Sequence, residues 1–375
     1  MRGPAVRPVV IAAGGTGGHF FPAEALAAEL IRRGRRIALM TDARSGASTS
    51  KTFADHEHFV LRGAGIAGRG AWGAATAAVA LAAGTAQART ILGRIGPAAM
   101  VAFGGYPAVA PVLGARLLHP RPPVVLHEQN AVLGRANRFL ARHADLLAVS
   151  FESTSRVPAS CRTAITGNPV RSPILRLADA PYAAPADRIR LLVLGGSLGA
   201  RVFSEVIPPA VALLSPELLA RLDITQQCRP EDLDRVRATY AALGIQAELS
   251  SFFPDIADRL AAAHLVIARA GASTIAELAV AGRPALLVPL PGAIDDHQSA
   301  NAGALAATGA ARLIPQNDFT PATLSRHLTG WLDDPDELMR AAATGRTLAR
   351  PDAAARLADA VEALIPSEAR PGEHL

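Results

Sequence analysis

Short apolar runs alternate with longer segments of helical periodicity along the whole chain. The runs are rich in Val, Ile, Leu and Ala, and such bounded runs are typical of parallel strands that are buried on both faces. The predicted strands are residues 9–12, 37–40, 59–61, 99–103, 124–126 and 146–149, and then 189–194, 223–227, 247–251, 265–268, 285–289 and 312–314. Regular alternation of strands and helices predicts an α/β protein with doubly wound parallel sheets and with binding sites at the carboxyl ends of the strands.

The alternation begins twice, each time with a strand, a glycine-rich turn and a helix. The first beginning is the run 9–12 with the turn Gly14–His19, and the second is the run 189–194 with the turn Gly195–Ala200. Before the second beginning, residues 178–187 are rich in Ala, Pro and Asp, as expected of a linker. We therefore predict two Rossmann-like halves with a cleft between them.

The boundary between the two halves is expected near residue 168. Residues 1–168 form the predicted first half and residues 169–349 the second, and the chain has enough apolar residues for two cores because half of its 375 residues are hydrophobic. The last helix, within residues 350–366, is expected to pack back on the first half.

A dense group of polar residues at predicted strand ends lies in the second half. The strand 265–268 leads through small residues into a helix that begins at Ser273 or Thr274. The first turn of a helix presents unpaired N–H groups and the positive end of the helix dipole, so the expected ligand is a phosphate. Glu277 lies one turn later, where its carboxylate can accept hydrogen bonds from two ribose hydroxyls. The next strand is followed by side chains that can bond to sugar hydroxyls: Asp295, Asp296, His297, Gln298 and Asn301. Together these residues suggest a nucleotide-sugar site.

The charge of the chain favours an acidic partner surface. The formal net charge of +6 fits either anionic lipid or nucleic acid. Basic clusters that bind nucleic acid are usually interleaved with aromatic residues, and residues 32–36, the densest basic cluster, contain none. We interpret this cluster as a solvated helix end and predict no nucleic-acid partner.

Residues 70–88 contain no charged side chain, so we considered whether this segment could contact a membrane. Its content of Ala, Gly and Thr makes it too weakly hydrophobic to be expected to span a membrane. With Arg69 and Arg89 at its ends, it is either an ordinary crossover helix or a shallow, peripheral membrane contact.

Cys161 and Cys228 are far apart in sequence, and the chain begins without a signal-peptide pattern, so a cytoplasmic location is expected.

The glycine-rich turns also raise a nicotinamide-dependent oxidoreductase as an alternative. The dinucleotide fingerprint requires a third glycine, where the first turn has Phe20, and a middle glycine, where the second turn has Ser197. Asp42 does match the acidic residue that binds ribose. This alternative predicts NAD binding at the Gly14 turn, but no residue set for hydride transfer is visible.

His19 is a candidate general base because it lies next to a helix N-terminus at the expected site. Such a position lowers the pKa of an imidazole and keeps it neutral, as a base must be. Taken alone, a single His is more often a capping or packed residue. No His, Cys or carboxylate cluster has the spacing of a transition-metal site, so a leaving diphosphate would be stabilised by fixed dipoles and side chains.

Seven motifs together resemble one known family. They are Gly14–His19, Gly104–Pro107, His127–Asn130, Thr166–Arg171, Gly195–Arg201, Arg269–Glu277 and Asp296–Asn301. In order and spacing they resemble the MurG family of bacterial glycosyltransferases, family 28, over nearly the whole chain. The resemblance implies a GT-B fold, in which two Rossmann-like domains face a cleft.

The same resemblance implies a reaction and its partners. The expected reaction is an inverting transfer of N-acetylglucosamine from UDP-N-acetylglucosamine to the C4 hydroxyl of lipid I, undecaprenyl-pyrophosphoryl-N-acetylmuramoyl-pentapeptide, which gives lipid II in peptidoglycan synthesis. The enzyme would attach peripherally to the cytoplasmic face of the inner membrane, with the anionic membrane surface and cell-wall assembly proteins as partners. No cofactor is expected to be required, and a divalent cation is not predicted from the sequence.

The resemblance also implies roles for individual residues. His19 is the expected base, with Glu128 as the runner-up, and Tyr106 and Asn137 are expected on the acceptor side. The donor would be bound by Thr16, Gly17, Gly18, Asn130, Arg171, Ser197, Phe253, Ala272, Ser273, Thr274, Glu277, His297 and Gln298. Within this set, Arg171 and Ser197 would meet the diphosphate, and the backbone at Phe253 would read uracil.

The sequence departs from the family pattern in two places. Many relatives have a glycine soon after the glutamine that ends the strand 223–227, whereas this chain continues with Cys228, Arg229 and Pro230, so no donor contact is assigned there. The segment 70–88 also has fewer bulky apolar residues than a strong membrane contact needs. A UDP-sugar epimerase or another UDP-sugar enzyme of this architecture is the second alternative.

Overall fold

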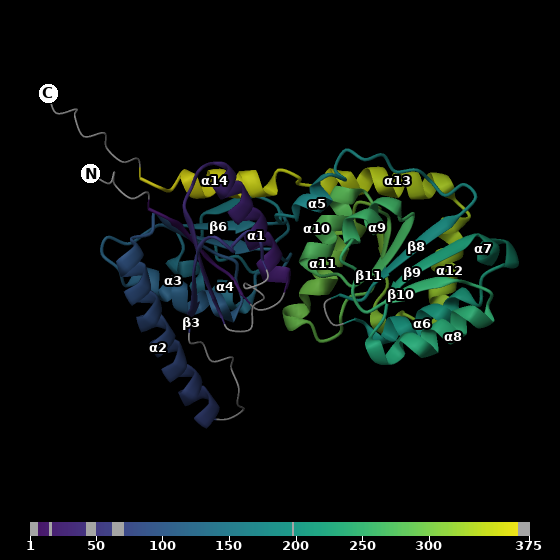
Figure 1. Ribbon diagram of the computed structural model, residues 1–375, viewed down its shortest axis with the longest axis horizontal. Coiled ribbons are helices and arrows are strands. Elements are labelled where there is room, and N and C mark those ends of the chain that lie inside the picture. Colours follow the sequence, from purple (N-terminus) through teal and green to yellow (C-terminus); the bar gives the residue numbers. More distant parts are fainter. Residues whose placement is uncertain (1–6, 15–16, 43–49, 62–70, 197–198, 367–375) are drawn as a thin grey trace. The chain divides into compact units, whose positions relative to one another are not determined.

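The computed structural model describes residues 7–14, 17–42, 50–61, 71–196 and 199–366. The chain divides into two compact units, each built on its own sheet (Figure 1). The first unit comprises Met1–Gln129, Leu133–Pro169 and Asp352–Leu375, and the second comprises Asn130–Val132 and Val170–Pro351. All described strand pairs are parallel, so the predicted fold class of two α/β halves with parallel sheets is confirmed.

The first unit has a seven-stranded sheet of order β3-β2-β1-β4-β5-β6-β7. Its strands are β1 (Val9–Ala12), β2 (Ile37–Asp42), β3 (Glu57–Leu61), β4 (Ala99–Ala102), β5 (Val124–Glu128), β6 (Leu146–Val149) and β7 (Thr163–Ile165). Its helices are α1 (Gly17–Arg32), α2 (Ala71–Ile95), α3 (Val109–Arg116), α4 (Arg135–Leu140) and α14 (Ala353–Glu362), with the short 3-10 turns η2 (Tyr106–Ala108) and η3 (Ala141–His143).

Two apolar layers cover the faces of this sheet. Alternate residues of a strand point to opposite faces, so Val9 and Ile11 pack with residues of α1 and α14, such as Leu357. Val10 packs instead with residues of α2 and α3, such as Leu92. Burial on both faces explains why the strands appear as continuous apolar runs in the sequence.

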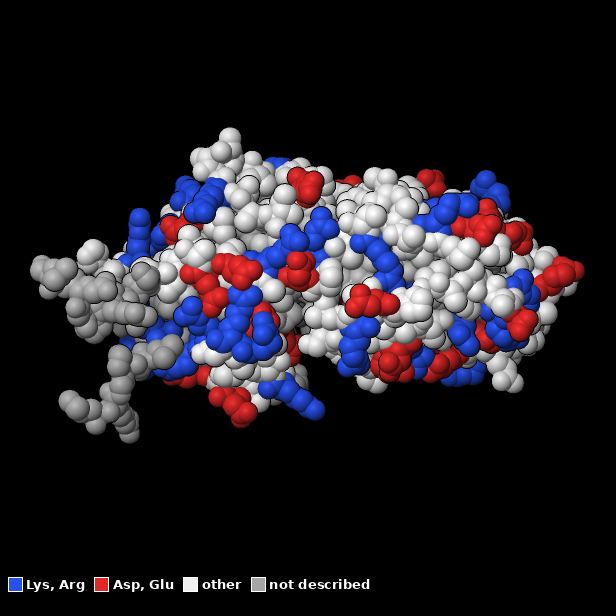
Figure 2. Space-filling model, turned by 90° about the horizontal axis from the view of Figure 1, so that it is seen from above, with Lys and Arg blue, Asp and Glu red and all other residues white. Residues whose placement is uncertain are grey.

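The C-terminal helix α14 packs beside α1 in the first unit (Figure 1). The guanidinium of Arg33 donates to Asp359 at 2.6 Å and to Glu362 at 2.7 Å. Arg32 and Arg35 are also paired, with Glu29 and Glu362, respectively. The basic cluster at the end of α1 is therefore paired with carboxylates. On the face that Figure 2 shows, basic and acidic side chains are also interspersed.

The second unit has a six-stranded sheet of order β10-β9-β8-β11-β12-β13. Its strands are β8 (Ile189–Leu194), β9 (Leu222–Gln227), β10 (Ala247–Ser250), β11 (Leu265–Ala268), β12 (Ala285–Leu287) and β13 (Ala311–Leu313). Its helices are α5 (Ser172–Leu175), α6 (Arg201–Val211), α7 (Pro216–Arg221), α8 (Leu233–Ala242), α9 (Ile256–Ala262), α10 (Ala272–Ala281), α11 (His297–Ala306), α12 (Pro321–Leu332) and α13 (Pro335–Gly345). The short 3-10 turns are η4 (Pro230–Asp232), η5 (Ile294–Asp296), η6 (Gln316–Asp318) and η7 (Arg346–Leu348).

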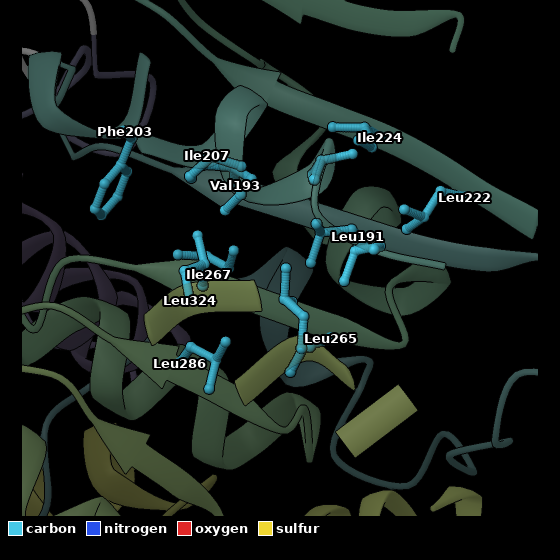
Figure 3. Close-up of a cluster of buried hydrophobic side chains, with 14 of the residues drawn as sticks. Leu191, Val193, Phe203, Ile207, Leu222, Ile224, Leu265, Ile267, Leu286 and Leu324 are labelled. Carbon is cyan, nitrogen blue, oxygen red and sulfur yellow. The ribbon is translucent and has the colours of Figure 1, made fainter. Parts of the chain in front are cut away.

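The core of the second unit lies between its sheet and helices that include α6 and α12. Figure 3 shows Leu191, Val193 and Ile267 of the central strands facing Phe203, Ile207 and Leu324 of these two helices. All six side chains are buried. This packing fixes the central strands β8 and β11, whose carboxyl ends lead to the predicted nucleotide-sugar residues.

The order of strands places a topological switch point in each sheet. In the first unit β1 pairs with both β2 and β4, and in the second β8 pairs with both β9 and β11. The loops that follow the two strands at such a point lie next to each other, which is where open parallel sheets bind ligands. The topology therefore brings the Gly14 turn beside the Gly104 loop, and the Gly195 turn beside the loop at Arg269.

Two elements differ from the sequence prediction. The strand β7 was not predicted because its three residues are partly exposed and include no apolar run. The first helix begins at Gly17 and contains Pro22, although the sequence places its start near Pro22. Proline favours a helix start and glycine disfavours a helix, so local propensity places the start of α1 too late in the chain. Because the helix begins at Gly17, His19 lies inside its first turn.

Candidate functional site

The imidazole of His19 is oriented by the loop that follows β4. Its Nδ1 lies 2.7 Å from the carbonyl oxygen of Phe103. A carbonyl oxygen only accepts hydrogen bonds, so this contact assigns the proton to Nδ1 and leaves the lone pair on Nε2. Nε2 faces Gly105, where an added Cβ would come within 3.3 Å of it. Gly105 has a φ of 68° and no side chain, so the backbone can approach the basic nitrogen.

Gln129, directly after β5, lies against the same imidazole. Its side-chain amide contacts His19 beside Nδ1, and its Nε2 donates to the carbonyl of Phe103 at 3.4 Å. The side chain is buried. Sequence reasoning did not single out this residue, although it lies within the motif His127–Asn130.

The carboxylate of Glu128 is buried and engaged by two donors. Its Oε2 accepts from the backbone N–H of Gly134 and from Nδ2 of Asn137, both at 2.9 Å. Asn137 Nδ2 also donates to the carbonyl of His127 at 3.0 Å. Glu128 therefore fixes the start of α4 and the buried side chain of Asn137, as expected of a residue that organises a loop.

His127 ties the end of β5 to the segment after β7. Its ring is buried, and its Nε2 donates to the carbonyl of Gly167 at 3.1 Å. Burial lowers the pKa of His127 to about 4, so the ring is neutral at physiological pH. The sequence gives no signal for this tethering role beyond the position of the residue in the motif.

The remaining predicted residues of the first unit lie around the same loops. Gly17 and Gly18 begin α1, and a Cβ at Gly17 would come within 2.7 Å of the ring of Phe21. Tyr106 begins η2 and is partly exposed. Thr16 of the first unit and Ser197 of the second lie outside the described residues.

The helix α10 begins at Ala272, close to the position where a phosphate-binding helix N-terminus was predicted. Gly271 precedes it in an extended conformation without a side-chain cap, and the first turn contains no acidic residue. The first helical bond runs from Ile275 N to Gly271 O at 3.0 Å. The backbone N–H groups of residues 272–274 thus form an uncapped helix start that suits an anion. In this part of the structure Ser273 Oγ is buried and has no hydrogen-bond partner among the described residues.

Arg171 and Glu277 are brought together as an ion pair. Glu277 Oε1 accepts from Nε of Arg171 at 2.9 Å and from Nη2 at 2.7 Å. Burial raises the pKa of Glu277, and the charge of Arg171 opposes this rise. Residues expected to meet the diphosphate and the ribose are therefore direct neighbours, and each satisfies the other's charge.

Arg171 also lines a pocket of the second unit. The same pocket is lined by Pro254–Asp258, directly after Phe253. Phe253 is buried, and the guanidinium carbon of Arg259 lies 4.1 Å from the centre of its ring. The loop expected to read uracil therefore borders the same pocket as Arg171.

Gln298 and His297 occupy the first turn of α11. The Oε1 of Gln298 accepts from Ala270 N at 3.3 Å and from Leu290 N at 3.0 Å, so this side chain joins the loops after β11 and β12. His297 Nδ1 bonds to Ile294 O at 2.8 Å. Of the two expected sugar contacts, Gln298 therefore bonds to the loop directly before α10.

Asn301 fixes the segment that contains Asn130, which belongs to the second unit. Its Oδ1 accepts from Ala131 N at 2.8 Å, and its Nδ2 donates to Asn130 Oδ1 and Ala270 O, both at 3.1 Å. Asn301 is completely buried. One side-chain amide therefore connects the predicted sugar contact Asn130 with the loop before α10.

Within the described residues, no group of three or more His, Cys, Asp or Glu side chains is arranged to hold a metal ion. The second unit instead offers an uncapped helix start, a paired carboxylate and guanidinium, and amide side chains. The first unit offers an imidazole with an oriented lone pair. Such groups suit binding of a phosphorylated sugar donor and abstraction of a hydroxyl proton.

Comparisons with known proteins agree with this chemistry. The model of the glycosyltransferase family 28 N-terminal domain matches residues 9–149, and the model of the family's C-terminal domain matches residues 190–357. The chain is 60% identical over 363 residues, 96% of this chain and 94% of the relative, to a Granulibacter bethesdensis protein. That protein is named UDP-N-acetylglucosamine--N-acetylmuramyl-(pentapeptide) pyrophosphoryl-undecaprenol N-acetylglucosamine transferase.

Two further similarities cover nearly the full length. A protein of the same name from Gluconobacter oxydans is 51% identical over 96% of this chain and 100% of the relative. The crystal structure of MurG from Acinetobacter baumannii matches with a TM-score of 0.77 and 32% identity, and the match covers 95% of this chain and 99% of that chain.

The ion pair predicts a pH-dependent stability effect. Replacement of Arg171 by Met leaves a buried carboxylate without its partner and is expected to lower the free energy of unfolding at pH 8 by about 2 kcal/mol. The pKa of Glu277 then rises further, so the folded state binds the proton more tightly than the unfolded state. The loss should therefore shrink as the pH falls to 5, which urea unfolding at both pH values measures.

The matched control is Arg201→Met, which removes an exposed ion pair with Glu205 and should change stability by less than about 0.5 kcal/mol. The double variant Arg171→Met/Glu277→Gln should recover most of the loss, because it removes the unpaired charge. Equal losses at pH 5 and pH 8, or a double variant no better than the single one, would contradict this account.

Proposed function

The chain belongs to glycosyltransferase family 28, and from this membership we propose that it transfers N-acetylglucosamine from UDP-N-acetylglucosamine to lipid I, giving lipid II. The observation that carries this function is the 60% identity, over 96% of the chain, to a relative named for this transfer. The chain is accordingly a hexosyltransferase of peptidoglycan synthesis, and its two parallel-sheet units have the GT-B fold. The names of the relatives favour the transferase over the nicotinamide and epimerase alternatives.

Most of the donor contacts in this proposal come from the second unit. The N–H groups at the start of α10 receive the diphosphate, and this is supported by the absence of an acidic residue from the first turn. Glu277 binds the ribose hydroxyls, for which it exchanges or shares its bond to Arg171, and the guanidinium then turns to the diphosphate. The other proposed donor contacts are Thr16, Gly17, Gly18, Asn130, Ser197, Phe253, His297 and Gln298.

His19 acts as the base in this proposal. Nε2 takes the proton from the C4 hydroxyl of lipid I, while the hydroxyl oxygen bonds to C1 of the donor sugar. The bond from C1 to the diphosphate breaks at the same time, so the configuration at C1 inverts and UDP leaves with the bonding electrons. The contact of Nδ1 with Phe103 supports this role, because it holds the lone pair on Nε2 and stabilises the imidazolium that forms.

Glu128 is a weaker candidate for the base. Two donors already engage its carboxylate, and loss of the negative charge would weaken both hydrogen bonds. We propose instead that Glu128 and Asn137 shape the acceptor side next to Tyr106. No cofactor is required in this proposal, because the helix N-terminus and Arg171 stabilise the leaving diphosphate.

We also propose peripheral attachment to the cytoplasmic face of the inner membrane, where lipid I is anchored. None of the helices in the described ranges combines the length and the apolar character that a membrane crossing requires. The helix α2 does expose Val79, whose side chain is 70% accessible, and the net charge of the chain is +6. An apolar contact supported by basic residues is the physical basis of such attachment.

The direct test of the function is transfer of labelled N-acetylglucosamine from its UDP donor to a lipid I analogue, with UDP release followed in parallel. Label in the lipid product is the expected result. Release of UDP without lipid labelling would point to another acceptor or to epimerase-like hydrolysis. Tight NAD binding without any transfer would instead support the oxidoreductase.

The choice of base predicts different results for two substitutions. His19→Asn keeps a donor for the carbonyl of Phe103 but removes Nε2, so kcat should fall by roughly 10²- to 10⁴-fold while the KM for the donor changes little. Glu128→Gln keeps the shape of the side chain. It should lower the melting temperature, and its kcat should fall much less than that of His19→Asn. Steady-state kinetics and thermal unfolding measure both effects, and the opposite ranking of the two kcat values would assign the base to Glu128.

The proposed membrane contact predicts that Val79→Asp weakens binding to vesicles that contain anionic lipid. Burial of one valine side chain corresponds to roughly a tenfold difference in the partition coefficient, which co-sedimentation measures. Leu213→Asp is the matched control, because Leu213 is similarly exposed but lies in the second unit, and it should bind like the unchanged protein. An equal loss in both variants would show that α2 is not the contact.

A further inference from the structure

Gln227 clamps two loops of the second unit from the end of β9. Its Oε1 accepts from the N–H of Gly195 at 3.0 Å. Its Nε2 donates to the carbonyl of Gly196 at 3.0 Å and to the carbonyl of Ser251 at 3.1 Å. Both hydrogens of the amide are therefore used, and they join the turn after β8 to the loop after β10.

The neighbouring glutamine has a different role. Successive side chains of a strand point in opposite directions, and Gln226 is buried and accepts from the hydroxyl of Tyr240 at 2.7 Å. That bond lies between β9 and α8, in the body of the unit. Only the second of the two adjacent glutamines reaches the loops at the carboxyl end of the sheet.

The described part of the turn after β8 contains three glycines. Gly196 and Gly199 have φ values of 83° and 70°, and a Cβ at Gly195 would come within 2.4 Å of the backbone nitrogen of Ala200. Glycine permits this close path but loses the most conformational freedom on folding, and it has no side chain with which to anchor the turn. The amide of Gln227 supplies that anchor on both sides of the peptide between Gly195 and Gly196.

We propose that Gln227 is a positioning residue that sets the separation between the turn at Gly195 and the loop that leads from Ser251 to Phe253. This inference rests on the proposed donor site, in which the first segment faces the diphosphate and the second reads uracil. One UDP molecule must meet both segments at once, so their spacing determines the affinity for the donor and the preference for uracil. The acceptor is bound elsewhere, so its KM does not depend on the clamp.

The test compares Gln227→Ala with the unchanged enzyme. The KM for UDP-N-acetylglucosamine and the Kd for UDP should each rise roughly tenfold, the ratio that corresponds to the net loss of one or two hydrogen bonds. The preference for the UDP donor over the corresponding TDP donor should fall, while the KM for the lipid I analogue should remain within about twofold. Hydrogen exchange at the Gly195 amide should become faster, since its acceptor is gone.

Tyr240→Phe is the matched control, because it removes one hydrogen bond from the adjacent glutamine without touching either loop. It should lower the melting temperature and leave the donor KM and the base preference unchanged. If Gln227→Ala does not fold, Gln227→Glu keeps an acceptor for Gly195 N–H and places an oxygen against the two carbonyls, so it should still raise the Kd for UDP.

Three results would overturn a part of this account. An unchanged donor KM and base preference in the Gln227 variants would remove the positioning role. The same changes in Tyr240→Phe would show general destabilisation rather than a clamp. If the unchanged protein binds UDP but does not transfer the sugar, the proposed function fails, while the Kd for UDP in the variants still decides the role of Gln227.

Discussion

Parallel strands that end at a switch point leave backbone N–H and C=O groups without a partner, and the rest of this structure depends on how those groups are satisfied. A buried backbone group without a hydrogen bond costs free energy comparable to a lost hydrogen bond. At the same ends, the proposed donor site also requires open backbone N–H groups, such as those at the uncapped start of α10. The loops must therefore be fixed without being capped.

Side-chain amides resolve this conflict in both units. Gln129 bonds to Phe103 O beside His19, and Gln298 bonds to the N–H groups of Ala270 and Leu290. An amide side chain carries both donors and an acceptor, so one residue can satisfy groups of opposite kind in neighbouring loops. It does so without a charge that would oppose a diphosphate. A glutamate in the same place would repel a diphosphate.

Much of the fold was predictable because it depends on patterns that repeat along the chain. The buried strands appear as apolar runs, and the uncapped turn before α10 was inferred from the small residues at 270–274 and the helix after them. Pairings between distant residues could not be predicted in this way. Nothing in the sequence shows that Arg171 bonds to Glu277, that Glu128 is occupied by Gly134 and Asn137, or that Gln227 reaches Ser251. These contacts arise only when the order of strands brings separate loops together.

The same reasoning applies to the ion pair between Arg171 and Glu277. Burial raises the pKa of Glu277 and the charge of Arg171 opposes this rise, and a protonated carboxyl binds ribose hydroxyls less well than a carboxylate does. In the proposed donor site Arg171 favours the ionised form of Glu277, and the diphosphate would be a second anionic partner for the same guanidinium. Under this proposal each of the two charged groups has a partner of opposite charge both before and after the donor binds. A site built in this way can bind a dianionic donor without first burying an unpaired charge.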